Sequence, residues 1–205
     1  MNQLAFFDRL PQQPAPDADW SPDDWETPDA VARAVASLVR TQDCPAYPRD
    51  RVIVEAGAGT GQVARYLPSG SHAVELQPLR AERGRQRAPH CQWHFDDFLT
   101  WEGVEAGTVD LVIGNPPFSR AADFINRGLE LLAPRGRVVF VLPCDTFHKP
   151  TFLDALACPV VVSDRRLVGR VAFLQNGKPY AKRQCYDSIF IIQRSNNMDL
   201  GIIWL

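Results

Sequence analysis

Short apolar runs rich in β-branched residues alternate with helix-like segments through the middle of the chain. The strand-like runs lie at 51–55, 72–76, 91–95, 109–114 and 137–142, and the helix-like segments at 61–67, 78–87, 120–132 and 150–157. Such alternation is typical of parallel sheets, because each parallel connection needs a crossover that is usually a helix. The pattern therefore predicts an α/β domain with a mostly parallel sheet.

Another helix is expected before the first strand. Thr27 is a candidate N-cap, Pro28 would take the first helical position, and an apolar stripe follows within 30–38. Proline suits the first turn because its missing N–H would have no partner there. Upstream, prolines interrupt a polar, acidic segment. We therefore expect residues 1–24 to form an extended arm ahead of a single domain at 25–205.

The last part of the chain departs from the alternation. Two strand-like stretches, 165–173 and 186–194, follow each other with no helix-like segment between them. Strands joined by such a short connection pair antiparallel. We expect a closing antiparallel hairpin and, with the five earlier strands, a seven-stranded sheet.

Composition narrows the classes of function. Hydrophobic residues make up 45% and charged residues 22%, as in globular proteins, and the net charge of -2 gives no overall attraction to nucleic acid. No apolar run approaches the roughly 18 residues of a membrane span, which predicts a cytoplasmic protein without a membrane partner. The five cysteines are scattered and never form C-x-x-C, so reduced thiols and no metal site are expected.

The first strand of the alternation ends in a glycine-rich loop. Glu55 is followed by Gly57, Gly59 and Gly61, and such glycines let the backbone turn sharply and approach a ligand. A dinucleotide fingerprint would need glycine where Gln62 stands, and a Walker A loop would need a lysine that is absent. S-adenosylmethionine has no phosphates and suits a loop flanked by carboxylates. We therefore predict this cofactor.

Acidic residues follow the next two strands. Glu75 ends the second strand, where its carboxylate is expected to accept both ribose hydroxyls, since ligands bind at the carboxyl ends of parallel strands. After the third strand, Asp97 is expected to accept from the adenine amino group, with Asp96 as the alternative. Phe98 is expected to cover the base.

The fourth strand runs into Asn115-Pro116-Pro117-Phe118. Asn and Pro also favour plain turns, but this tetrapeptide would face the cofactor from the strand beside the glycine loop. The Asn115 side-chain carbonyl and the Pro116 backbone carbonyl are two acceptors for the hydrogens of an exocyclic amine, whose lone pair would then face the methyl group. Pro117 adds rigidity, and Phe118 offers a stacking face for an extruded base. These four residues are the predicted catalytic motif.

The order of these motifs resembles that of amino-group methyltransferases of the Rossmann-like class I fold, in particular gamma-type adenine-N6 DNA methyltransferases. The resembling segments are WETPDAVARAVASLV, VIVEAGAGTGQV, AVEL, DDFLTW and VDLVIGNPPFS. The resemblance implies that Glu26 and Thr27 contact the methionine end of the cofactor, and that Phe173 covers the other face of the base. The chain has no room for the separate recognition domain that such enzymes usually carry, so a partner subunit is one candidate source of specificity.

The substrate expected from this resemblance is adenine N6 in nucleic acid, with DNA ahead of RNA because the W-E-T-P start resembles DNA enzymes most. RNA adenine and protein glutamine stay open, since the N-P-P-[FY] motif also occurs in enzymes that methylate them. A non-catalytic cofactor-binding module is the third reading, and the intact tetrapeptide argues against it.

Two basic clusters are candidates for contacting a nucleic-acid backbone. The favoured one surrounds the final hairpin and consists of Arg165, Arg166, Arg170, Lys178, Lys182 and Arg183. The other is the run from Arg80 to Arg87, which by default is a solvated helix face.

Overall fold

A computed structural model describes residues 25–40, 51–166, 170–175, 178–179, 186–195 and 202–204. The arm predicted at 1–24 lies outside the described residues. Within the described ranges, no helix is both long enough and apolar enough to cross a membrane.

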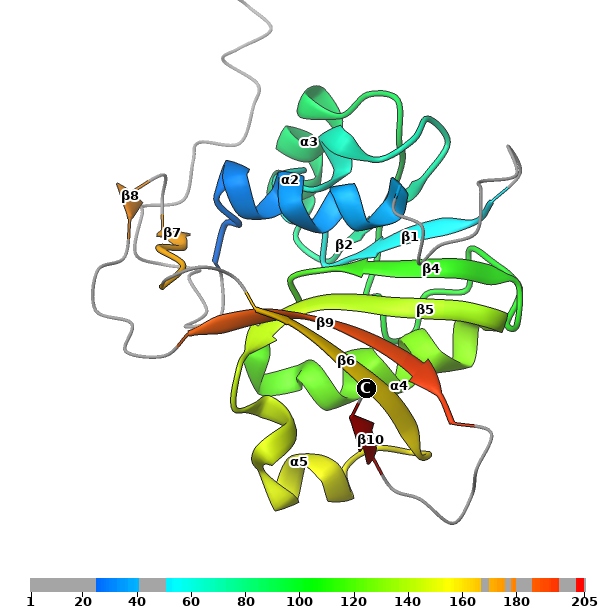
Figure 1. Cartoon of the computed structure of the whole chain (residues 1–205). Helices are drawn as coiled ribbons and strands as arrows, with labels where there is room; N and C mark the ends of the chain where they lie inside the picture. The colour runs from blue at the N-terminus through cyan, green and yellow to red at the C-terminus, as the bar shows by residue number, and fades with distance from the viewer. Residues whose placement is uncertain are drawn as a thin grey trace, which may run out of the picture.

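A mixed sheet of eight strands forms the centre of the structure, in the order β10-β6-β9-β5-β4-β1-β2-β3 (Figure 1). The strands are β1 Ile53–Ala56, β2 His72–Glu75, β3 Gln92–Phe95, β4 Val109–Gly114, β5 Leu132–Pro143, β6 Val160–Arg166, β9 Asp187–Arg194 and β10 Ile202–Trp204. Neighbours pair in parallel except at β9, which runs antiparallel to both β5 and β6. The Rossmann-like α/β prediction is confirmed, and β10 is an eighth strand that the sequence analysis did not predict.

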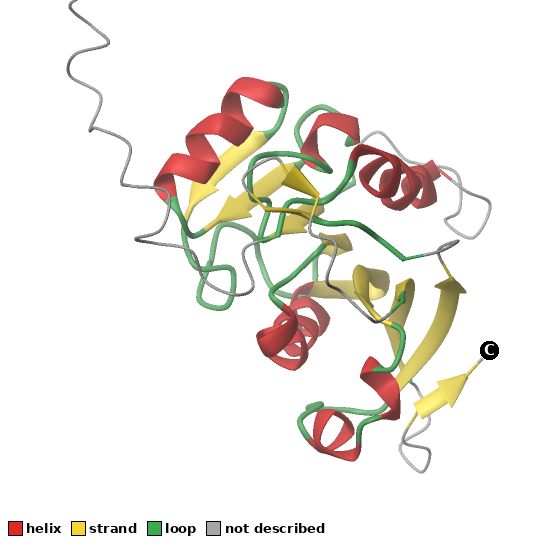
Figure 2. Ribbon diagram, turned by 90° about the vertical axis from the view of Figure 1, so that its left-hand side faces the viewer, coloured by secondary structure: helices red, strands yellow, loops and turns green. Residues whose placement is uncertain are grey.

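Helices cover both faces of this sheet (Figures 1 and 2). Helices α2 and α3 lie on one face, and α4 and α5 on the other. Their bounds are α2 Asp29–Ser37, α3 Pro78–Arg87, α4 Ala121–Leu131 and α5 Pro150–Asp154, with short 3₁₀ turns η1 Leu38–Arg40, η2 Ala64–Tyr66, η3 Phe118–Arg120 and η4 Thr146–His148.

Alternate residues of the central strands enter two apolar clusters. In β5, Val138 and Phe140 pack in the same cluster as Phe124 of α4. Val139 of the same strand joins the cluster that contains Val35 of α2. Successive strand residues point to opposite faces, so a continuous apolar run is buried on both sides, as parallel strands require.

The helix predicted at 61–67 is mostly absent. The glycine loop continues as turns through Val63, and only η2 is helical. Leu67 is extended. The physical reason is Pro68, because proline disfavours a helical conformation in the residue before it.

The start of α2 also differs from the prediction. Pro28 is the N-cap, the helix begins at Asp29, and no side chain caps it. Thr27 is only 5% exposed and lines a pocket described below. The N-cap role predicted for Thr27 is therefore wrong, because its side chain is buried in that pocket.

The closing hairpin is present with different bounds. Strands β6 and β9 pair antiparallel, as predicted, but β6 begins at Val160 rather than Arg165. Val160 and Val162 are buried in the α4-side cluster, whereas Val171 and Phe173 pack in the α2-side cluster outside any strand. A short second pairing joins β7 Leu174–Gln175 to β8 Lys178–Pro179.

Candidate active site

Three glycines turn the backbone between β1 and η2. Gly57, Gly59 and Gly61 have φ angles of 67°, 56° and 77°, which L side chains rarely adopt. A Cβ on Gly61 would lie 3.0 Å from Cα of Gly84 in α3. The glycines therefore both shape the loop and let α3 pack directly on it.

Glu75, at the end of β2, holds this loop in place. Its Oε2 accepts a hydrogen bond of 2.7 Å from the Gly59 N–H, and its Oε1 accepts one of 2.9 Å from the Gln77 N–H. The residue is 7% exposed. Each carboxylate oxygen has a second lone pair, so Glu75 can still accept bonds from a ligand.

A pocket lies over the loop, with an empty volume of about 270 Å³ that includes space open to solvent. It is lined by Trp25, Glu26, Thr27, Glu55, Gly57, Ala58, Gly59, Thr60, Gln62, Arg80 and Asn115. Of the predicted cofactor residues, Gly61, Glu75, Asp97 and Phe98 are not part of the lining. The structure brings the others from the start of α2, the glycine loop and the end of β4 to one pocket. Sequence reasoning missed Trp25, Thr60 and Arg80, whose residue types carry no signal specific to a cofactor.

Two buried oxygens of this pocket accept no hydrogen bond from any described residue. They are Oε2 of Glu55 and Oδ1 of Asn115. Buried acceptors without donors are costly, and sites that receive a ligand are one setting that compensates them. Burial first, and then repulsion from Glu75, raise the pKa of Glu55 well above its ordinary value, while a backbone bond from Ala64 opposes the shift. A ligand with a donor group or positive charge would satisfy both oxygens.

The predicted catalytic motif begins where β4 passes very close to β1. A Cβ on Gly114 would lie 2.6 Å from the carbonyl oxygen of Ala56, so only glycine fits without a shift. This approach delivers Asn115 to the glycine loop. Pro116 is buried, whereas Asn115 and Pro117 are half-buried.

Phe118 and Phe173, the two residues predicted to stack on a base, contact each other directly. Their ring centroids lie 6.0 Å apart with an interplanar angle of 73°, an edge-to-face contact. Phe118 is half-buried and Phe173 is 1% exposed. In this geometry Phe173 supports Phe118 from the side. A base held between the two rings would need them parallel and roughly 7 Å apart, twice the usual contact distance.

The segment before α2 is joined to the segment around Phe173. Glu26 and Leu174 exchange two backbone hydrogen bonds, of 2.9 Å and 3.0 Å. The Thr60 hydroxyl donates to Oε1 of Glu26 over 3.2 Å. An isolated bridge has no alternating pattern, so it could not be predicted from the sequence.

The residues predicted to hold adenine lie beyond the pocket lining. Asp97 accepts from the Leu99 N–H over 3.0 Å, and Asp96 accepts from the Asp97 N–H over 2.8 Å. Phe98 is 2% exposed and packs against Phe124, with centroids 5.3 Å apart. Their roles toward adenine stay predictions. Sequence analysis missed three exposed apolar side chains near these strand ends, Leu76, Leu79 and Phe95.

Of the basic residues predicted at the final hairpin, Arg170 is the one whose side chain the structure describes. Arg170 is exposed, and its guanidinium carbon lies 5.8 Å from the centroid of the Tyr186 ring. The other members either have undescribed side chains or lie outside the described residues: Arg165, Arg166, Lys178, Lys182 and Arg183. Among the side chains that are described, no group of three or more His, Cys, Asp or Glu could hold a metal ion.

Comparisons with known proteins identify the fold. No family model matches the chain. A tRNA1(Val) (adenine(37)-N6)-methyltransferase from Glaesserella parasuis serovar 5 (strain SH0165) is 27% identical over 129 residues, which cover 48% of this chain and 54% of that protein. The chain therefore spans about half the length of this curated relative.

Two solved structures share the architecture. A TehB-like S-adenosylmethionine-dependent methyltransferase from Corynebacterium glutamicum matches with a TM-score of 0.54 and 18% identity, over 80% of this chain and 88% of that one. The 23S rRNA methyltransferase ErmE matches with a TM-score of 0.59 and 16% identity, over 86% of this chain and 72% of that one. This protein has the class I methyltransferase fold.

Proposed function

We propose that this protein is an S-adenosylmethionine-dependent methyltransferase that acts on adenine N6 in a nucleic acid. The observation that carries the proposal is the buried Oδ1 of Asn115, which accepts no bond from any described residue and lines the pocket over the glycine loop. An acceptor held ready at this position suits an amine as the group to be methylated.

The pocket has the donor and acceptor chemistry that this cofactor needs. The unpartnered Oε2 of Glu55 suits the ammonium of the methionine end, with Glu26 and Thr27 beside it in the lining. Beyond the pocket lining, Glu75 at the end of β2 would accept from the ribose hydroxyls, and Asp97 or Asp96 from the adenine amino group. S-adenosylmethionine supplies a methyl group on a positively charged sulfur.

The catalytic motif would prepare the amine for attack. Asn115 Oδ1 and the Pro116 carbonyl accept the two amino hydrogens, so the nitrogen lone pair turns out of the ring plane toward the methyl group. Phe118 stacks on the base, and the nearby Phe173 fixes its ring. After transfer, one amino proton leaves to water, which makes the nitrogen neutral again. No metal or general base is required for this chemistry.

RNA and DNA are both candidate substrates. The preference for DNA rested on the W-E-T-P start. The relative that is 27% identical is named for adenine N6 in tRNA, so RNA is at least as well supported as DNA. The choice of target within the nucleic acid, and a partner subunit that would supply it, remain parts of the proposal.

The experiment that tests this function incubates the protein with methyl-labelled S-adenosylmethionine and separate pools of RNA, DNA and protein. We expect label in a nucleic-acid pool and none in protein. Label confined to protein would instead identify a glutamine-type acceptor, and the nucleic-acid proposal would be wrong.

A further inference from the structure

Helix α3 carries an unusual concentration of positive charge. Its ten residues, PLRAERGRQR, include four arginines and one glutamate, so its formal charge is +3, whereas the whole chain has a net charge of -2. Positive charge is therefore concentrated locally on this helix. Local segregation of this kind creates a field that the net charge does not reveal.

The arginines of α3 differ in how their charge is compensated. Arg85 donates two bonds, of 2.9 Å and 2.8 Å, to the Glu82 carboxylate. Arg83 and Arg87 are exposed and lie one turn apart on the same side of the helix. Arg87 donates to the carbonyl and hydroxyl oxygens of Thr60, at 2.9 Å and 3.1 Å. These are neutral acceptors, so its positive charge persists.

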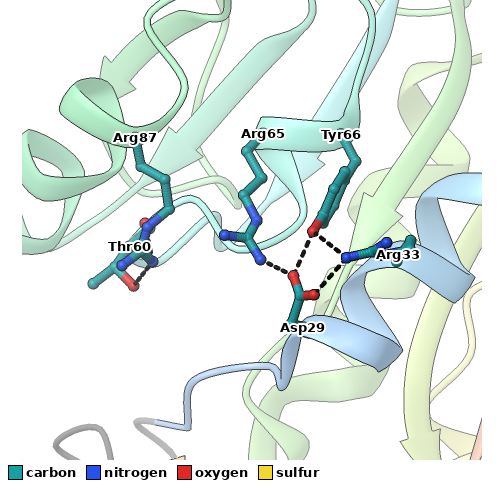
Figure 3. Close-up of polar contacts among 6 residues, drawn as sticks. All are labelled: Asp29, Arg33, Thr60, Arg65, Tyr66 and Arg87. Atoms are coloured by element: carbon teal, nitrogen blue, oxygen red, sulfur yellow. Dashed lines mark hydrogen bonds and ion pairs between the residues drawn. The ribbon is translucent and has the colours of Figure 1, made fainter.

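A second group of arginines lies where α2 meets η2 (Figure 3). The Asp29 carboxylate pairs with both Arg33 and Arg65 and also accepts from the Tyr66 hydroxyl. One carboxylate shared by two guanidinium groups leaves a surplus positive charge. Both guanidinium carbons lie over the Tyr66 ring, 5.4 Å and 4.8 Å from its centroid.

Both groups of arginines contact the glycine loop of the candidate active site. Thr60, which holds Arg87, also lines the cofactor pocket. The N–H of Arg65 donates to the Gly61 carbonyl over 3.3 Å, one residue further along. Figure 3 shows the side chains in a row from Arg87 through Arg65 to Arg33. Arg83, which Figure 3 does not draw, lies one helical turn from Arg87 on α3. We call Arg33, Arg65, Arg83 and Arg87 together the arginine strip.

We propose that the arginine strip binds backbone phosphates of the nucleic acid that carries the target base. This inference rests on the proposed function and names a surface for its substrate. Guanidinium groups match phosphate oxygens with paired donors and are only weakly hydrated, which makes arginine well suited to this contact. Phosphate contacts fix the orientation of a nucleic acid without reading its sequence. The strip begins at the pocket rim, because Arg87 contacts Thr60 of the pocket lining.

The test is a double variant, Arg33→Gln with Arg83→Gln, which spares the contacts of Arg65 and Arg87 near the pocket. The matched control is Arg85→Gln with Arg135→Gln. This control removes the same amount of charge. Arg85 is already paired with Glu82, and Arg135 is exposed near the start of β5, at the end of that strand away from the site. Fluorescence anisotropy with a labelled single-stranded RNA and a labelled DNA duplex gives affinities over a salt series.

We expect the double variant to bind nucleic acid more weakly, with its salt slope reduced by about 0.7 to 0.9 for each lost phosphate contact. The control should keep the parental slope, and calorimetry should give the same cofactor affinity for all three proteins. If the double variant bound nucleic acid as tightly as the parent, or if the control lost as much affinity as the double variant, the proposed role of the arginine strip would be wrong.

Failure of the strip and failure of the proposed function give different results. If the parent methylates adenine while the double variant binds as tightly as the parent, the strip alone is wrong. If the parent binds nucleic acid through the strip but labels no adenine, the methylation proposal fails and the strip stands, because binding requires no turnover. A parent that binds neither RNA nor DNA overturns both.

Discussion

Oε2 of Glu75 accepts a hydrogen bond of 2.7 Å from the N–H of Gly59, which ties the end of β2 to the middle of the glycine loop. The same carboxylate was predicted from the sequence as a ribose acceptor. Glu75 therefore has two roles in this account, because it positions the loop and offers its remaining lone pairs to the cofactor.

Replacement of Glu75 should weaken cofactor binding strongly. Glu75→Ala removes a charged acceptor and the restraint on Gly59. Since bonds to charged groups contribute about 1.5–3 kcal/mol, we expect affinity for S-adenosylmethionine to fall on the order of 10- to 100-fold. Calorimetry measures this, with Glu82→Ala on exposed α3 as the control for lost charge. Unchanged affinity in a folded Glu75→Ala protein would remove this residue from the site.

Replacement of Asn115 should separate binding from turnover. Asn115→Ala removes an acceptor that acts on the target amine, so cofactor affinity should stay near that of the parent while kcat falls by about two or more orders of magnitude. Steady-state kinetics and calorimetry on the same preparation measure both. An active variant with parental kcat and a confirmed methylated product would falsify the mechanism.

The raised pKa of Glu55 predicts a pH-dependent stability. Burial, then repulsion from Glu75, raise this pKa well above its ordinary value of 4.5. The folded protein therefore retains a proton that the unfolded chain has released. The stabilising contribution is complete below about pH 4.5 and is lost as the pH rises through the folded-state pKa.

The glutamine of Glu55→Gln has nearly the same shape as glutamate but cannot ionise. The variant should therefore not lose stability as the pH rises through the folded-state pKa of Glu55. Melting curves of the cofactor-free proteins should show the melting temperature of the variant rising relative to the parent as the pH increases. A difference that stays constant across the pH range would mean that Glu55 titrates normally. Calorimetry should also show weaker cofactor binding by the variant, because a bound ammonium would favour the ionised carboxylate of Glu55, a form that the amide cannot adopt.

Gly114 should tolerate no larger residue. In Gly114→Ala the new Cβ would lie 2.6 Å from the Ala56 carbonyl oxygen, so β4 must shift away from β1 and carry Asn115 with it. We expect a loss of roughly 1–3 kcal/mol in stability together with lower activity. Gly107→Ala is the control, since a Cβ there meets nothing within 4 Å although φ is +80°. Equal effects of the two changes on activity would contradict the proposed approach of the strands.

Much of the fold could be predicted because its signal is local. The apolar run at 138–142 and the alternating segments around it dictate a sheet covered on both faces. The differences arise where long-range contacts decide. Strand β6 begins at Val160 because that residue packs in the core, and the segment with Phe173 leaves the strand to pair at Leu174 with Glu26. Nothing in the pattern around Leu174 indicates a partner so distant in sequence.

The site was predictable where chemistry restricts the residue type. Glycines with positive φ and the Asn-Pro-Pro-Phe tetrapeptide are such cases, and the structure brings Gly57, Gly59 and Asn115 to one pocket. Arg80 and Thr60 were not predicted to line the pocket, because an arginine on a helix and a threonine in a turn are common everywhere. Only the close packing of α3 on the glycine loop, at Gly61 and Gly84, places them at the rim.

The position of the transferred methyl group tests the central claim most directly. The parent and Asn115→Ala are each incubated with trideuteromethyl S-adenosylmethionine and a nucleic-acid pool, which is then digested to nucleosides for mass spectrometry. The account predicts trideuterated N6-methyladenine nucleoside with the parent, and at least a hundredfold less, on the order expected for a lost catalytic acceptor, with the variant. Label on any other nucleoside atom, or equal N6 label with both proteins, would contradict it.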